Sequence, residues 1–235
     1  MSSDYAELTT NNSSALKRFS HGRRFRQALA LMEIKTGDRV LDFGAGDGFM
    51  MRIIASTHEP GELVGYEPME SQYVQLFTTI KEFGDNRLTA VGEISRLCDA
   101  GFDKICCLEV LEHLTKENQL KVLSQLHRLL SPSGLLVVSV PIEIGPAGLF
   151  KNAMRRVLRQ EHDGATCTNI VKAFAGLNID RADVPYIASH IGFDHRVLPP
   201  LFLANGFSIV SRHFSPLPIL GSFFNSQIFL VLQRQ

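Results

Sequence analysis

The sequence of 235 residues predicts an α/β fold, in which helices cover both faces of a doubly wound, mainly parallel sheet. Three observations favour it. Apolar segments of strand length alternate with segments of helical period, and this alternation implies right-handed crossovers between parallel strands. The first strand segment ends in a glycine-rich turn. Hydrophobic residues make up 45% of the chain, which is enough for the core of a single α/β domain over 1–235.

The segment 40–48 predicts a strand, a tight turn and the start of a helix. Its apolar run ends at Asp42, and Gly44, Gly46 and Gly48 follow at alternate positions before an apolar helical segment. Glycine permits the positive φ angles and the close backbone approach that such a turn needs. The free N–H groups at the helix start would then face a ligand that lies over the end of the strand.

The glycine spacing disfavours a dinucleotide as this ligand. In the dinucleotide pattern the third glycine comes one residue later, where this chain has Phe49. The carboxylate of Asp42, directly before the turn, would also repel a phosphate group. A ligand that carries a cation suits the turn better.

Two further predicted strands each end in an acid. Glu67 and Pro68 follow the strand segment 63–66, at about the distance from the glycines where an acid meets the ribose of an adenosine ligand. One carboxylate can accept hydrogen bonds from both ribose hydroxyls. The next strand, over 87–91, leads to Gly92 and Glu93.

The fourth and fifth strands complete the predicted core. The fourth covers 102–108 and leads into the segment EVLEHL at 109–114. The fifth covers 134–141 and follows a predicted turn at 131–134.

Together these segments resemble the class I S-adenosylmethionine (SAM) dependent methyltransferases, and EVLEHL resembles motif IV of their ubiquinone-pathway O-methyltransferase-like group. The resemblance covers 36–141 well. It implies a Rossmann-like sheet of seven strands in the order 3-2-1-4-5-7-6, with the last strand antiparallel and a helical lid insertion. It also implies methyl transfer from SAM, which leaves S-adenosylhomocysteine (SAH), to an oxygen of a small, lipid-linked or glycan-type acceptor.

The resemblance also implies roles for single residues. Asp42 would lie near the ammonium group of SAM, Glu67 on the ribose and Glu93 on the adenine amino group. The full cofactor-binding set is Asp42, Gly44, Ala45, Gly46, Gly48, Glu67, Pro68, Glu93, Ile94, Leu108 and Glu109.

The remaining segments divide the chain into four parts, which are a tail and helix (1–35), the SAM-binding core (36–141), a lid or substrate insertion (142–193), and a C-terminal helix and strands (194–235). Helices are predicted over 15–34, 48–57, 70–83, 116–130 and 196–205, and the last strands over 207–214 and 226–232. Arg18 and Arg24 of the first helix either reach the carboxylate of SAM or belong to a solvated basic face.

The lid insertion contains a predicted basic amphipathic helix over 149–160. Its apolar residues recur at i, i+3, i+4 and i+7, and its basic residues lie mainly on another face. Two interpretations stay open. The helix packs on the domain as a lid, or it makes peripheral contact with an anionic membrane surface.

Two histidines are the predicted catalytic residues. His113 follows the fourth strand, and His190 matches a family histidine that borders the active site. A neutral imidazole is a suitable general base for a hydroxyl acceptor. Glu109, Glu112, His113 and His190 also resemble the magnesium site of small-RNA 2′-O-methyltransferases, so Mg²⁺ is possible, but no metal ligand is assigned. Alternatively, Glu112 caps the following helix or faces solvent.

Composition narrows the remaining alternatives. The formal net charge is zero, so no nucleic-acid partner is expected. Two alternative functions nevertheless stay open, an RNA 2′-O-methyltransferase and a non-catalytic SAM-fold partner protein. Four cysteines without metal or redox spacing suit a reducing, cytoplasmic setting. No apolar run reaches the length of a membrane span.

Overall fold

The computed structural model describes residues 15–146, 148, 166–175, 177, 179, 187, 192–217, 221 and 225–235. The chain forms two compact units. The N-terminal unit comprises Met1–Leu108, Leu126–Val137 and Leu232–Arg234, and the C-terminal unit comprises Glu109–Gln125, Val138–Val231 and Gln235. The predicted helix over 149–160 and the candidate base His190 lie outside the described residues.

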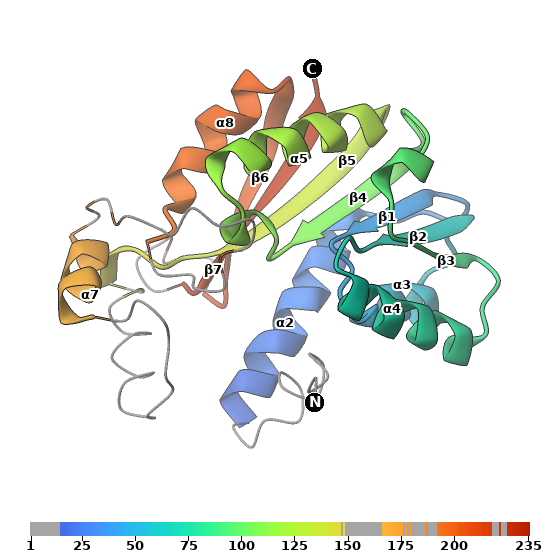
Figure 1. Cartoon of the computed structure of the whole chain (residues 1–235), viewed down its shortest axis with the longest axis horizontal. Coiled ribbons are helices and arrows are strands. Elements are labelled where there is room, and N and C mark those ends of the chain that lie inside the picture. Colours follow the sequence, from blue (N-terminus) through green and yellow to red (C-terminus); the bar gives the residue numbers. More distant parts are fainter. Residues whose placement is uncertain are drawn as a thin grey trace. The chain divides into compact units, whose positions relative to one another are not determined.

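Seven strands form one sheet in the order β3-β2-β1-β4-β5-β7-β6 (Figure 1), and the last strand is antiparallel. This confirms the predicted topology. β1 pairs in parallel with β2 and β4, and β2 with β3. The strands are β1 Arg39–Phe43, β2 Glu62–Tyr66, β3 Leu88–Val91, β4 Phe102–Leu108, β5 Leu130–Pro141, β6 Phe207–Ser215 and β7 Gln227–Arg234.

Helices follow the strands much as the sequence predicts. The α-helices are α2 Ala15–Met32, α3 Phe49–Thr57, α4 Glu70–Phe83, α5 Lys116–Leu129, α7 Cys167–Phe174 and α8 Leu198–Ala204. Short 3₁₀ helices are η1 Ile94–Arg96, η2 Leu111–His113 and η3 His195–Val197. None of the helices in the described ranges is long and apolar enough to cross a bilayer.

Two predicted boundaries are wrong. The helix expected over 196–205 begins as η3, because the Asp194 side chain accepts a hydrogen bond from the Arg196 N–H (2.9 Å), and a proline then stands in the first turn of α8. The turn expected at 131–134 is the exposed beginning of β5. Its first carbonyl, that of Leu130, accepts a hydrogen bond from the Arg234 side chain (2.8 Å), which secures the strand there.

The first strands are buried because helices pack closely against them. In β1 every residue from Val40 to Phe43 is buried, as expected for a central parallel strand. In β2, a side chain at Gly65 would place its Cβ 2.4 Å from the sulfur of Met51 in α3. Glycine therefore allows α3 to lie against the strand. Cys106 and Cys107 of β4 are fully buried.

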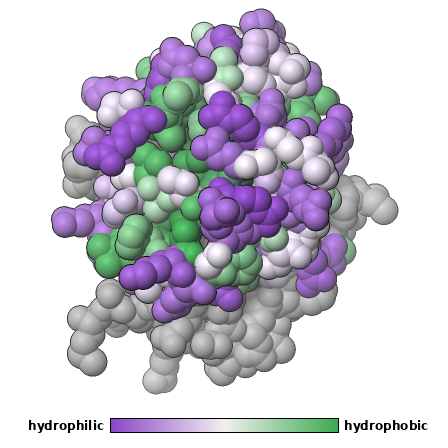
Figure 2. Space-filling view, turned by 90° about the vertical axis from the view of Figure 1, so that its right-hand side faces the viewer, coloured by the Kyte–Doolittle hydropathy of each residue, from purple (hydrophilic) through white to green (hydrophobic). Residues whose placement is uncertain are grey.

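On the outer side of α4, two apolar side chains stay exposed, those of Val74 and Phe77. Figure 2 turns the side with β3 and α4 toward the reader, and hydrophobic groups lie there between hydrophilic ones.

Candidate functional site

The glycine-rich loop joins β1 to α3 in the conformation that its sequence predicts. Gly44, Gly46 and Gly48 all have positive φ angles (81°, 56° and 82°). The N–H groups of Gly44 and Ala45 donate to the carbonyl of Tyr66, at 2.9 and 3.0 Å, and so tie the loop to the end of β2. Among the residues that the structure describes, no atom lies within 4 Å of the position of a Cβ at Gly46, so the loop borders open space there with respect to them.

Glu67 holds the loop from the neighbouring strand end. Its side chain is buried, and one carboxylate oxygen accepts from the Gly46 N–H (3.0 Å) while the other accepts from the Met69 N–H (2.9 Å). Burial raises the pKa of Glu67, and these two hydrogen bonds lower it. Each oxygen of a carboxylate has a second acceptor position, so the side chain can still bind ribose hydroxyls.

Asp42 is a buried carboxyl with one unsatisfied oxygen. Its residue surface is 3% exposed. Oδ1 accepts from the Cys106 thiol (3.3 Å), whereas Oδ2 has no hydrogen-bond partner among the residues that the structure describes. The pKa of Asp42 is raised to about 7, mainly by burial; the hydrogen bond from Cys106 opposes this rise, and the nearby charges of Glu67 and Asp47 contribute to it. An ammonium group such as that of SAM would satisfy this oxygen.

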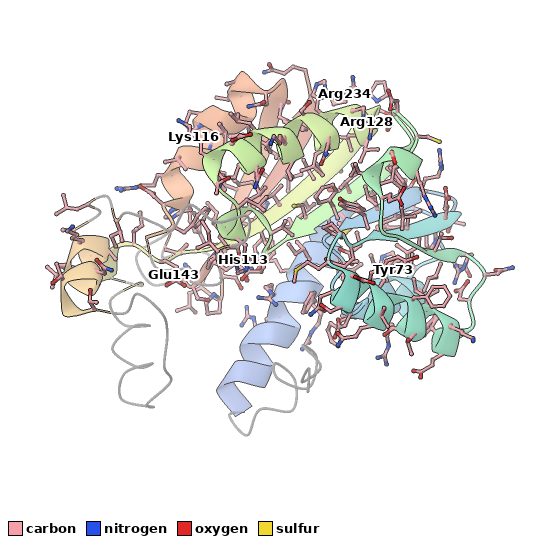
Figure 3. The ribbon with its side chains drawn as sticks, viewed as in Figure 1. Tyr73, His113, Lys116, Arg128, Glu143 and Arg234 are labelled. Carbon is pink, nitrogen blue, oxygen red and sulfur yellow. The ribbon has the colours of Figure 1, made fainter. Side chains whose placement is uncertain are left out.

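The residues predicted to hold the adenine lie after β3. Glu93 is exposed, and its carboxylate pairs with Arg96 at 3.6 Å. Ile94 is partly buried, whereas Pro68 is exposed. Sequence reasoning missed Tyr73 of α4, whose ring lies 3.5 Å from the position of a Cβ at Gly92 (Figure 3). No local pattern indicates this contact, because the two residues lie on different elements.

The first helix packs beside the loop. The rings of Phe25 in α2 and Phe49, the first residue of α3, are 4.9 Å apart. The guanidinium of Arg24 lies 4.9 Å from the Phe25 ring, and its Nε atom is buried. Arg24 therefore does not belong to a fully solvated basic face. The side chain of Arg18 lies outside the described residues.

In the C-terminal unit, Glu109 is fixed by a hydrogen-bonded cluster that the sequence did not indicate. Its φ angle of 57° is unusual for a residue other than glycine, and such strain often marks functional positions. Its N–H donates to the Ser139 carbonyl (3.0 Å). Gln227 donates through Nε2 to the Glu109 carboxylate (2.7 Å) and to the Ser139 hydroxyl (3.2 Å). We call Glu109, Ser139 and Gln227 the β7 cluster.

His113 is held by the lid insertion. Its Nδ1 lies 2.8 Å from the Ile187 carbonyl, and the Ile187 N–H donates to the His113 carbonyl, also at 2.8 Å. Since a carbonyl only accepts, Nδ1 must carry a proton, and in the neutral ring Nε2 is the basic nitrogen. Figure 3 labels His113 and Glu143, which is buried like Glu112. The expectation that Glu112 faces solvent is therefore wrong, and its capping of the following helix stays a prediction.

Within the described part of the chain, no group of three or more His, Cys, Asp or Glu side chains is arranged to hold a metal ion. His190, the fourth member of the magnesium set considered from the sequence, lies outside that part.

A family model described as a methyltransferase domain matches residues 15–172. The chain therefore belongs to the methyltransferase domain family. This confirms the resemblance to class I SAM-dependent methyltransferases and agrees with SAM as the predicted cofactor. The match does not single out the ubiquinone-pathway-like group, which stays a prediction. No curated protein sequence matches the chain.

Solved structures of similar fold carry different activities. A SAM-dependent methyltransferase from Listeria monocytogenes has 14% identity and a TM-score of 0.62, with 92% of this chain and 99% of that chain covered. The magnesium protoporphyrin IX methyltransferase of Synechocystis PCC 6803 with bound SAH has 17% identity and a TM-score of 0.62 (95% and 89% covered). The cyclase SpnF has 15% identity and a TM-score of 0.63 (92% and 82% covered). At these identities the similarity establishes the fold alone.

Proposed function

We propose that this member of the methyltransferase domain family binds SAM at the loop after β1 and transfers its methyl group to an oxygen of a small, lipid-linked or glycan-type acceptor. The observation that carries the proposal is the pair of buried acids around the loop. Glu67 already organises the loop through Gly46, and Asp42 keeps an oxygen for a cationic group.

SAM would supply an activated methyl group on its sulfonium, and an attacking acceptor oxygen would form a C–O bond as the C–S bond breaks and SAH leaves. The role of the chain's own residues is to bind SAM and to orient it toward the acceptor. Asp42 would hold the ammonium group of the amino-acid part, Glu67 would hold the ribose hydroxyls, and Glu93 would accept a hydrogen bond from the adenine amino group. Arg24, half-buried beside the loop, is a candidate partner for the carboxylate. Such positioning in a site that excludes water accounts for most of the expected rate enhancement.

Proton removal from a hydroxyl acceptor falls to a histidine. With Nδ1 of His113 bonded to Ile187, Nε2 is the atom that accepts a proton. His190 is the second candidate for this role. The lid insertion that contributes Ile187 and His190 then determines which acceptor is bound. The acceptor class itself rests on the resemblance of the segment 109–114.

The alternative functions predict different results in simple assays. An RNA 2′-O-methyltransferase would bind RNA with strong salt dependence and would lose activity in EDTA. A non-catalytic SAM-fold protein would bind SAH without forming it from SAM. Sedimentation with anionic vesicles tests the proposed membrane contact of 149–160, and no sedimentation with any vesicle would exclude it.

The proposal is tested first by calorimetric titration with SAH. Wild type should bind in the micromolar range, and Glu67→Ala should lose roughly 30-fold or more in affinity, because the ribose loses a charged acceptor and the loop loses its anchor at Gly46. The matched control is Glu62→Ala, which removes an exposed acid of the same strand that pairs with Arg39. Failure of wild type to bind SAH, or an equal loss in both variants, would contradict the proposal.

A further inference from the structure

Asp42 is a buried acid with one unsatisfied carboxyl oxygen among the residues described. Its residue surface is 3% exposed, and β4 approaches it so closely that the Cys106 thiol donates to Oδ1. Oδ2 has no hydrogen-bond partner among the residues described. Keeping a carboxylate ionised in such a place is unfavourable, and a buried carboxyl then takes up a proton instead.

The charged groups that act on Asp42 come from two neighbouring segments, and both are acids. Asp47 belongs to the glycine-rich loop and Glu67 follows β2. The thiol of Cys106 on β4 stays protonated, since burial and Asp42 itself raise its pKa well above its usual value. Lys104, the lysine of β4, pairs with Val40 rather than with Asp42, so it lies toward the beginning of the strand.

We propose that Asp42 is protonated in the free protein and releases its proton to solvent when the ammonium group of the cofactor binds beside it. The proposal rests on the proposed function and deepens it, because it makes Asp42 the residue that recognises the charge of the ligand's amino-acid part. The O–H bond of the carboxyl breaks, its proton passes to the buffer, and an ion pair forms. The ammonium keeps its protons, and no covalent bond to the ligand is made.

The proposal predicts the direction in which SAH affinity changes with pH. Binding that releases a proton becomes stronger as pH rises, so SAH affinity increases between about pH 6 and pH 8 and then levels off. Because the pKa of free Asp42 is raised to about 7, its carboxyl is mostly protonated below that pH and mostly ionised above it. A ligand without the amino-acid part gains nothing from the ionised form and should show no such dependence.

The experiment is calorimetry of SAH binding in pairs of buffers that differ in ionisation enthalpy, which counts the protons released. Wild type should release most of a proton per SAH at pH 6 and much less at pH 8. The matched ligand is 5′-methylthioadenosine, which lacks the ammonium group and should release none. Asp42→Asn should abolish the release with SAH. Cys106→Ala removes the thiol donor that favours the ionised carboxylate, so its release should persist to higher pH.

The outcomes separate this inference from the proposed function. If wild type binds SAH but releases no more protons than it does with 5′-methylthioadenosine at pH 6, the inference fails and the cofactor assignment stands. If wild type does not bind SAH at all, the proposed function fails and the inference fails with it. The comparison of the two ligands uses wild type only, so it holds even if a variant does not fold.

Discussion

The glycine-rich loop of the N-terminal unit and the β7 cluster of the C-terminal unit are built on different sequence distances. The loop and its acids lie within one strand–turn–helix segment and the next strand end, and the bond from Gly46 to Glu67 spans 21 residues. In the β7 cluster, Gln227 reaches Glu109 across 118 residues and Ser139 across 88. The contacts of the first region therefore join residues that are close in the sequence. Those of the second region join residues that only the folded sheet brings together.

The largest expected effect comes from adding a side chain at Gly65, where α3 packs against β2. Gly65→Val should lower the free energy of unfolding by about 3 kcal/mol, because the new side chain overlaps Met51 and approaches Ala45 and Leu76 within 3.2 Å. Chemical denaturation measures this change. Gly92→Ala is the matched control, since its Cβ would make only ordinary contact with Tyr73 at 3.5 Å. Equal losses in both variants would contradict the packing argument.

Much of the N-terminal region could be predicted because each of its features has a local cause. Alternate glycines require a turn of positive φ, the buried run before them requires a central strand, and an acid at a strand end requires a polar partner. The prediction of α4 matches its observed bounds, Glu70–Phe83. The hydrogen bond from Cys106 to Asp42 was not predictable, because Cys106 approaches from another strand, β4.

The C-terminal region was less predictable for the same physical reason. EVLEHL indicates Glu109 and His113, but neither Gln227 nor Ile187 carries a local pattern that indicates its partner. The burial of Glu112 also depends on the packing of distant segments, so a local pattern suggested an exposed acid instead. Whether His190 joins this region stays a prediction.

A second prediction, of intermediate size, tests whether a change in the β7 cluster affects SAH binding at the loop. Gln227→Leu should lower the free energy of unfolding by about 1–3 kcal/mol, because the partly buried carboxylate of Glu109 and the buried hydroxyl of Ser139 lose their shared donor. SAH affinity should stay within about twofold of wild type, since the described hydrogen bonds of the Gln227 side chain go to Glu109 and Ser139 and none of them reaches the loop. Denaturation and titration measure the two effects separately.

Ser139→Ala is the matched control for Gln227→Leu. It removes only the longer bond of 3.2 Å and leaves the bond to Glu109 in place, so its effect on stability should be smaller. A tenfold loss of SAH affinity in Gln227→Leu would show that the β7 cluster is coupled to cofactor binding and would end the distinction between the regions.

The smallest expected effect tests whether the acids of the N-terminal region are equivalent. Glu93 is exposed and its bond to Arg96 is long, so Glu93→Ala should change the free energy of unfolding by less than about 0.5 kcal/mol. SAH affinity should fall roughly fivefold, the value of one hydrogen bond to adenine, and Glu93→Gln should retain most of it because an acceptor oxygen remains.

Arg96→Ala breaks the ion pair but keeps the acceptor, so its affinity should match wild type. If Glu93→Ala lost as much SAH affinity as Glu67→Ala, the difference in exposure between the two acids would have no effect on cofactor binding. The expected difference follows from burial, because Glu67 is buried and also holds the loop, whereas Glu93 is exposed and pairs only weakly with Arg96.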